Sequence, residues 1–147
     1  MENLYNSRLK HTMETWQGKD SATVYTKIPK SMDHSSSVVK CVIDRLEQLR
    51  KNEKSVKEYG LLLDVGCGNG ASIRDFLPYF RRAVGIDINK YQVDIAKQMT
   101  RSDKTSFYVK KGDLFPVEDS SVDLIICAEA AHYMDMKAFV REVPPQN

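Results

Sequence analysis

The sequence predicts an α/β fold in which a parallel β-sheet is covered by helices on both faces. Short continuous apolar runs alternate with segments of helical periodicity from residue 61 onward, which is typical of parallel strands buried on both faces. A glycine-rich turn, GCGNG at residues 66–70, joins the first of these runs to the helix that follows. We expect right-handed crossover connections between the strands.

The chain begins with a segment of different character. Residues 1–34 are polar and have no sustained period, so we expect an N-terminal arm or lid there, and a single domain over residues 35–147. Residues 35–51 carry an apolar stripe at helical spacing, and the serines at their start are suited to capping a helix. The charged run that follows, up to Gly60, breaks this pattern and predicts a connector.

The remaining elements follow from apolar runs and their boundaries. We predict strands at residues 61–65, 83–86, 105–109 and 122–128 and helices at residues 71–77, 89–99 and 136–143. Pro78 helps to end the first of these helices. Asn89 is suited to cap the second helix, with Gln92 three residues later as in a capping box.

The composition disfavours several classes of protein. With 22 basic and 20 acidic residues among 147, the formal net charge is +2, which is no strong signal for nucleic-acid binding. Cys41, Cys67 and Cys127 form no CxxC pair, so we expect reduced thiols and no metal site, in the cytoplasm or alternatively the nucleus. Neither a secretory leader nor an apolar run of the roughly 20 residues that span a bilayer is visible.

The glycine-rich turn is the strongest signal for a ligand. It lies between a predicted strand and a predicted helix, the context in which a glycine pattern marks a ligand site, and glycines let a ligand approach the backbone closely. The pattern alone leaves alternatives open. Gly66, Gly68 and Ala71 also fit the dinucleotide spacing G-x-G-x-x-G/A, and a strand-to-helix turn can bind no ligand at all.

Four acidic residues near the predicted strand ends indicate which kind of ligand the turn binds. Asp64 and Asp87 end the first two predicted strands, Asp113 follows the third and Glu129 the fourth. The carboxyl ends of parallel strands meet at one edge, where ligands bind. Carboxylates gathered there repel a pyrophosphate and suit a ligand with an ammonium and a sulfonium, such as S-adenosylmethionine, whose ribose diol suits Asp87. For any one acid, helix capping or solvation is the alternative.

Four stretches resemble successive motifs of class I S-adenosylmethionine-dependent methyltransferases: LLLDVGCGNG, AVGID, KKGDLFPVEDSSVDLI and ICAEAAHYMDMKAFVREV. The resemblance extends over about residues 35–143 and is nearest to the small-molecule type that includes trans-aconitate methyltransferase-like proteins (type 11). It implies a Rossmann-like fold, S-adenosyl-L-methionine as cofactor, and transfer of a methyl group to a small-molecule acceptor such as a carboxylate.

The resemblance also implies which residues bind the cofactor. They lie in the glycine turn or directly after the predicted strands: Asp64, Gly66, Gly68, Gly70, Asp87, Ile88, Asp113, Leu114, Ala128 and Glu129. Asp87 matches the acid that holds the ribose hydroxyls, and Asp113 matches the acid near the adenine amino group. Ala128 and Glu129 match the end of the fourth strand, beside the methyl group that is transferred.

His132 and Tyr133 are the candidate catalytic residues, because they follow the fourth strand at the ligand edge. They are placed to orient an acceptor, and a histidine can act as a base near neutral pH; packing against the N-terminal arm is the alternative. No catalytic triad is expected, since the sulfonium is already an activated leaving group. Trp16 and Tyr25 are placed to close over the cofactor, although ordinary hydrophobic anchoring is the simpler interpretation.

The far end of the chain departs from the family pattern. A complete fold of this class has seven strands, whereas this sequence has room for four, and Pro144 and Pro145 cannot continue the last helix. We therefore expect a truncated form with strand order 3-2-1-4, whose fourth strand is an edge that invites self-association. Asp119 and Asp123, at the start of that strand, are expected to be turn and surface residues.

Three functions remain open on the sequence alone. The first is an active methyltransferase, and the second is a non-catalytic remnant that binds cofactor or interacts with other proteins. The third is a nucleotide-binding oxidoreductase domain, which the four acids disfavour.

Overall fold

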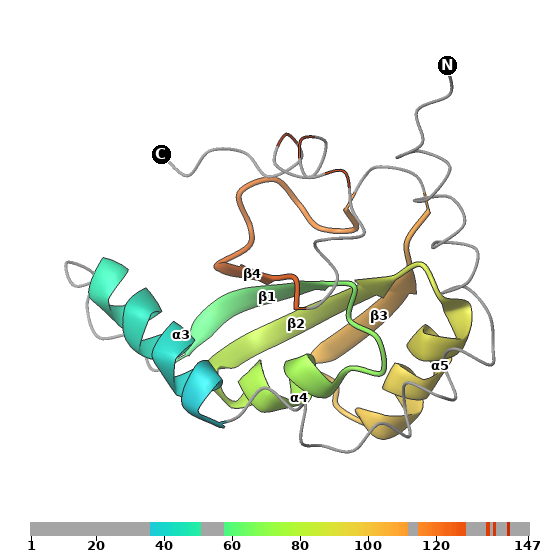
Figure 1. Cartoon of the computed structure of the whole chain (residues 1–147), viewed down its shortest axis with the longest axis horizontal. Coiled ribbons are helices and arrows are strands. Elements are labelled where there is room, and N and C mark those ends of the chain that lie inside the picture. The colour runs from blue at the N-terminus through green and yellow to red at the C-terminus, as the bar shows by residue number, and fades with distance from the viewer. Residues whose placement is uncertain are drawn as a thin grey trace.

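The computed structural model describes residues 36–50, 58–111, 115–128, 135, 137 and 141. Within them the chain forms one parallel sheet of order β3-β2-β1-β4 (Figure 1). The strands are β1 (Tyr59–Val65), β2 (Phe80–Asp87), β3 (Thr105–Val109) and β4 (Leu124–Ile126). The helices are α3 (Ser36–Leu49), α4 (Ala71–Phe76), the 3-10 turn η2 (Leu77–Tyr79) and α5 (Lys90–Met99). The predicted α/β class and strand order are thus confirmed.

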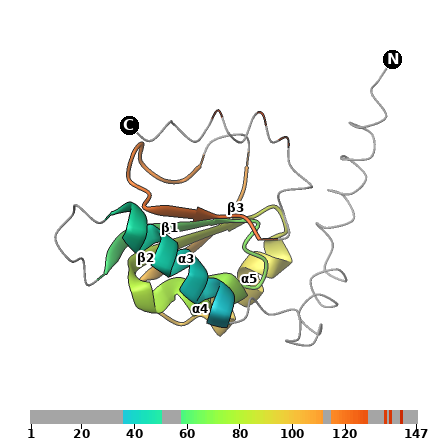
Figure 2. The same cartoon turned by 60° about the vertical axis from the view of Figure 1, so that its left-hand side comes forward.

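The two central strands are buried on both faces. Leu62 and Leu63 are both fully buried, yet they belong to different apolar clusters, because successive side chains of a strand point to opposite faces. One cluster joins the sheet to α3, α4 and α5, which lie together on one side of it (Figure 2). On the other face, Phe115, Val117 and Val122 from the segment before β4 pack against the sheet.

The strands begin earlier than the apolar runs suggest. Phe80 opens β2 three residues before the predicted start, because the exposed Arg81 and Arg82 interrupt the apolar pattern. Tyr59 opens β1 and lies opposite Phe80 in the register, with the two ring centroids 5.5 Å apart. The predicted connector up to Gly60 is therefore wrong at its end, where an aromatic pair starts the sheet.

Helix α5 begins at the predicted cap, although not with the predicted capping box. The Asn89 side chain accepts hydrogen bonds from the backbone N–H groups of Tyr91 (2.9 Å) and Gln92 (3.3 Å). The Asn89 N–H itself donates to Asp87 Oδ1 at 2.8 Å. Asp87 thus takes the place that a capping box would give to Gln92, and the start of α5 is tied to the end of β2.

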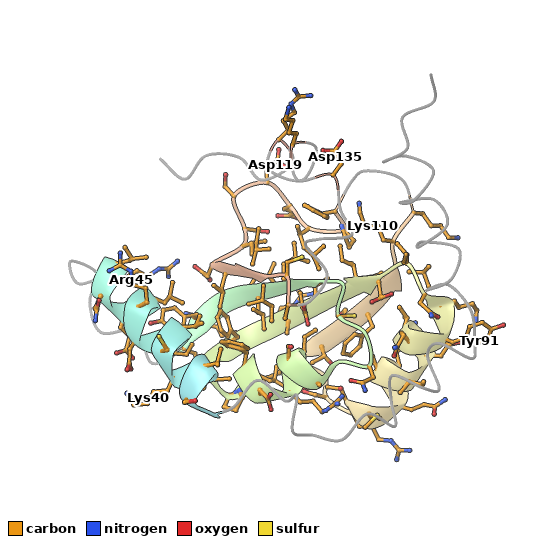
Figure 3. All side chains as sticks on the ribbon, in the orientation of Figure 1. Lys40, Arg45, Tyr91, Lys110, Asp119 and Asp135 are labelled. Atoms are coloured by element: carbon orange, nitrogen blue, oxygen red, sulfur yellow. The ribbon has the colours of Figure 1, made fainter. Side chains whose placement is uncertain are left out.

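Asp123 corrects one sequence-based expectation. Its side chain is only 22% exposed, and its carboxylate pairs with the Arg50 guanidinium. Oδ2 accepts hydrogen bonds from the N–H groups of Gly60 (2.6 Å) and Leu61 (3.0 Å). It is therefore a partly buried link between α3, β1 and β4, rather than a freely solvated surface residue. Asp119 is exposed, as expected, on the loop that precedes β4 (Figure 3).

Several expectations concern the margins of the described chain. Strand β4 is shorter than the predicted 122–128 and, within the residues described, pairs only with β1, so it lies at an edge of the sheet. Lys137 and Arg141 are helical, in line with the helix predicted at 136–143. The rest of that helix and the arm predicted at 1–34 lie outside the described residues. Among the described helices, none has the length and apolar character needed to cross a membrane.

Candidate cofactor-binding site

The glycine turn connects the carboxyl end of β1 to α4 and is held by the neighbouring strand (Figure 1). The N–H groups of Gly66 and Cys67 both donate to the Ile86 carbonyl of β2, at 2.8 and 3.0 Å. Gly66, Gly68 and Gly70 all have positive φ angles, of 78°, 52° and 84°. Because side chains disfavour this left-handed region, the turn requires glycine.

Gly68 and Gly70 serve different purposes in this turn. A Cβ atom at Gly70 would lie 3.1 Å from Thr100 Oγ1 and 3.3 Å from Ala96 Cβ, so a side chain there would press on α5. A Cβ atom at Gly68 would meet no atom of the described residues within 4 Å. Gly70 is therefore needed for packing inside the protein, whereas Gly68 leaves an open side of the backbone that a ligand can approach.

Asp87 links this turn to the end of β2. Its Oδ2 accepts a hydrogen bond from the Gly68 N–H at 2.9 Å, and its Oδ1 accepts the bond from Asn89 described above. Burial raises the pKa of Asp87, while the hydrogen bonds from the backbone of Asn89, Gly68 and Ile88 act in the opposite direction. These N–H groups stabilise the ionised carboxylate.

Asp64, unlike Asp87, is deeply buried without backbone N–H groups to stabilise its charge among the described residues. The residue is only 1% exposed, and its Oδ2 has no hydrogen-bond partner among the described residues. Burial, and secondly the charge of Asp87, raise the pKa of Asp64 from 3.8 to about 7. An unsatisfied buried carboxylate is costly, and such groups with a strongly shifted pKa gather at functional sites.

Two thiols complete the surroundings of Asp64. Cys67 is buried in the glycine turn, and Cys127, half-buried, follows β4. Burial and the charges of Asp64 and Asp87 raise the pKa of the Cys67 thiol, and burial and Asp64 raise the pKa of Cys127. Both cysteines are therefore neutral thiols at physiological pH, beside two carboxyl groups.

The structure brings together about half of the predicted cofactor-binding residues. Asp64, Gly66, Gly68, Gly70 and Asp87 form the edge just described. Ile88 directly follows Asp87, and Ala128 follows the end of β4; both are half-buried. The other predicted site residues lie outside the described part of the chain: Asp113, Leu114, Glu129, His132 and Tyr133.

Lys110, three residues before Asp113 in the sequence, contacts both the end of β2 and Phe115. It lies beyond the carboxyl end of β3 (Figure 3), and its N–H donates to the Asp87 carbonyl at 2.8 Å. Its ammonium group lies over the Phe115 ring, 4.8 Å from the centroid. Lys110 is thus held next to the strand that carries Asp87 and against the Phe115 ring.

Sequence reasoning missed the groups that hold the turn from behind. Arg74 Nη1 donates to the Asn69 carbonyl (2.8 Å) and to Thr100 Oγ1 (3.0 Å). Asn69 Oδ1 in turn accepts a hydrogen bond from the first N–H of α4, that of Ala71, at 3.2 Å. No pattern connects Arg74 with Thr100, because they are 26 residues apart, on α4 and at the C-cap of α5.

Gly85 lies within the AVGID stretch, and its packing role is a second feature that sequence reasoning missed. A Cβ atom at this position would lie 2.7 Å from the Phe107 ring, 2.8 Å from Ile73 and 2.9 Å from the Cys67 sulfur. Its absence lets α4 and the glycine turn approach β2. The signal was present, since a glycine inside a strand often marks such a close approach.

Comparison with known proteins identifies the family. Residues 63–144 match the family model described as a methyltransferase domain. A probable S-adenosylmethionine-dependent methyltransferase of Saccharomyces cerevisiae is 33% identical over 87 residues, which are 56% of this chain and 30% of that protein. An uncharacterized methyltransferase of Bacillus subtilis is 33% identical over 86 residues, which are 56% of this chain and 34% of that protein. The chain thus spans about a third of the length of these relatives.

Solved structures agree with this assignment. The crystal structure of the Bacillus subtilis protein aligns with a TM-score of 0.53 at 31% identity, over 68% of this chain and 44% of that one. An S-adenosylmethionine-bound amino pentose methyltransferase from Micromonospora echinaspora shares the fold, with a TM-score of 0.63 at 22% identity over 82% and 50% of the two chains. The chain described here belongs to the class I S-adenosylmethionine-dependent methyltransferases.

Proposed function

We propose that this chain binds S-adenosylmethionine at the carboxyl edge of its sheet and contributes the cofactor site of a methyltransferase. The observation that carries the proposal is Asp64, a buried carboxyl group near Asp87 with one oxygen that has no partner among the described residues. A negative site of this kind favours a ligand with positive charge and repels a pyrophosphate.

The residues present fit this cofactor in two further respects. A carboxylate offers about four lone-pair positions, and backbone N–H groups donate to each of the two Asp87 oxygens, so the oxygens retain capacity to accept from ribose hydroxyls. A Cβ atom at Gly68 would meet nothing within 4 Å in the part of the chain that the structure describes, which leaves room for the cofactor to approach the backbone.

We assign the other roles from the family resemblance. Ile88 and Leu114 would flank the adenine, Asp113 would accept from its amino group, and Ala128 and Glu129 would lie beside the methyl group. His132 and Tyr133 would orient the acceptor, for which we propose a small molecule. When bound, S-adenosylmethionine supplies an activated methyl group and its own leaving group, so the chain's residues mainly bind and orient.

Calorimetric titration with S-adenosylhomocysteine and, separately, with NAD tests this function. We expect the chain to bind S-adenosylhomocysteine and not NAD. Binding of NAD alone would contradict the methyltransferase site and favour an oxidoreductase domain. Binding of S-adenosylhomocysteine without methyl transfer to any small acceptor would support a non-catalytic cofactor-binding part, which is the alternative because the chain spans about a third of its relatives' length.

Replacing Asp87 by Ala sharpens this test. Loss of a hydrogen bond to a charged group should weaken S-adenosylhomocysteine binding by about 1.5–3 kcal/mol, which is roughly a 10- to 150-fold increase in Kd. Asp94→Ala is the matched control, since Asp94 forms an exposed ion pair with Lys90 at 2.7 Å on α5. An unchanged Kd for Asp87→Ala would show that Asp87 does not hold the ribose.

A further inference from the structure

We propose that ligand binding at this site displaces a proton from Asp64, so that affinity for a cationic adenosine ligand increases with pH around neutrality. The inference rests on the proposed function, because it concerns the same edge of the sheet. It goes beyond that function by assigning to Asp64 the charge response of the site.

Among the described residues, the elements around Asp64 bring no positive charge to it. Strand β2 contributes the Asp87 carboxylate, the glycine turn contributes the Cys67 thiol and β4 leads into the Cys127 thiol. None of the ion pairs in the described part of the chain includes Asp64. At 1% exposure, water compensates little for this lack.

The two carboxyl groups are not equivalent, and this difference decides which one holds the proton. Asp87 accepts N–H bonds on both oxygens, and such bonds favour the ionised form. Asp64 Oδ2 has no such partner within the described segments. The negative charge therefore resides on Asp87, and with a pKa of about 7 Asp64 is about half protonated at neutral pH.

A positively charged ligand would favour the ionised form of Asp64 over the protonated form. When an ammonium or sulfonium enters the site, the ionised form of Asp64 becomes favourable, and its O–H proton passes to the buffer while the ligand is chemically unchanged. Below pH 7 each unit of pH should change the association constant by up to about tenfold, and above it the effect should level off. The two thiols add nothing in this range, because their pKa values are raised.

Calorimetry in buffers of different ionisation enthalpy counts the released proton. We expect S-adenosylmethionine, which carries a sulfonium as well as an ammonium, to release close to one proton at pH 6, about half at pH 7 and almost none at pH 8.5, with Kd falling about tenfold from pH 6 to pH 8.5. Asp64→Asn should abolish the difference, whereas the exposed control Asp94→Asn should keep it. Titration of the ligand's own amino group is common to all three proteins and cancels in the comparison.

Three results would overturn the inference. Binding by the unmodified chain at pH 6–7 without proton release would do so, and so would proton release that persists in Asp64→Asn. If Asp64→Asn fails to fold, carbon-13 NMR of the unmodified chain follows the Asp64 carboxyl directly; a pKa that does not fall on adding S-adenosylmethionine contradicts the proposal. Absence of any binding, by contrast, overturns the proposed function itself.

Discussion

Asp64 and Asp123 lie at opposite ends of the same parallel sheet, and they differ in whether their carboxyl groups have hydrogen-bond partners. At the amino end, Asp123 has a guanidinium and two backbone N–H groups as partners. At the carboxyl end, Asp64 is more deeply buried and one of its oxygens has no partner in the described chain. The same residue type is thus satisfied at one edge and left unsatisfied at the other.

The pKa values of the two aspartates differ accordingly. Burial raises the pKa of Asp123, but the hydrogen bonds from Arg50 and Leu61, the charge of Arg50 and the bond from Gly60 outweigh it, and the pKa falls below 3.8. For Asp64, burial and the nearby charge of Asp87 act together and raise the pKa to about 7. Asp123 therefore favours the folded state once ionised, and Asp64 disfavours it.

We infer that Asp123 contributes to the stability of the fold, whereas Asp64 contributes to ligand affinity. Asp123 joins the end of α3 to β1 and β4, and Arg50 also lies over the Tyr59 ring, 5.4 Å from its centroid. That end needs no ligand to be satisfied. At the other end the unsatisfied charge of Asp64 lowers stability, and a cationic ligand is the group that would relieve it.

The largest expected effect is on the pH dependence of stability. The folded pKa of Asp64 is above its unfolded value, so the folded state binds more protons between about pH 4 and pH 7, and stability falls as pH rises through that window. Between pH 5 and pH 8 the free energy of unfolding of the ligand-free chain should fall by roughly 2–3 kcal/mol more than that of Asp64→Asn. Urea denaturation at the two pH values measures this. If the free energy of unfolding depended on pH in the same way in the unmodified chain and in Asp64→Asn, Asp64 would not differ from Asp123 in this respect.

Replacing Asp123 by Ala should be the next largest change. It leaves the Arg50 guanidinium and two N–H groups without their acceptor, so the free energy of unfolding should fall by about 2 kcal/mol at pH 7. The change should become smaller as pH falls from about 4 through the lowered pKa of Asp123, because protonation then removes the stabilising charge. Asp119→Ala, at an exposed position of the same loop, should change stability by less than about 0.5 kcal/mol. Equal losses of stability in Asp123→Ala and Asp119→Ala would mean that the contacts of Asp123 with Arg50, Gly60 and Leu61 do not stabilise the fold.

The smallest effect should come from the support behind the glycine turn. Thr100→Val removes the hydroxyl that accepts from Arg74, and the free energy of unfolding should fall by about 1 kcal/mol. Because Arg74 also holds the Asn69 carbonyl, S-adenosylhomocysteine should bind less tightly. Thr105→Val is the matched control: its hydroxyl donates to the Ser102 carbonyl at 3.0 Å, away from the turn. Equal losses of affinity in both variants would show that Thr100 has no particular role in the site.

The sequence by itself determined the order of strands and helices, the glycine turn and the positions of Asp64 and Asp87 at strand ends. These features depend on local rules, namely apolar periodicity, the positive φ angles that only glycine adopts readily, and the common edge of parallel strands. The same rules found the Asn89 cap, since it lies within three residues of its partners.

Only the tertiary structure decided which buried groups are satisfied. Asp123 looked like a turn residue because its partners, Arg50 and Gly60, are 73 and 63 residues away. The Arg74–Thr100 contact and the lack of a partner at Asp64 Oδ2 have the same origin. The physical reason is that burial and hydrogen bonding are set by strand register and helix packing, which bring distant residues together and leave no trace in local spacing.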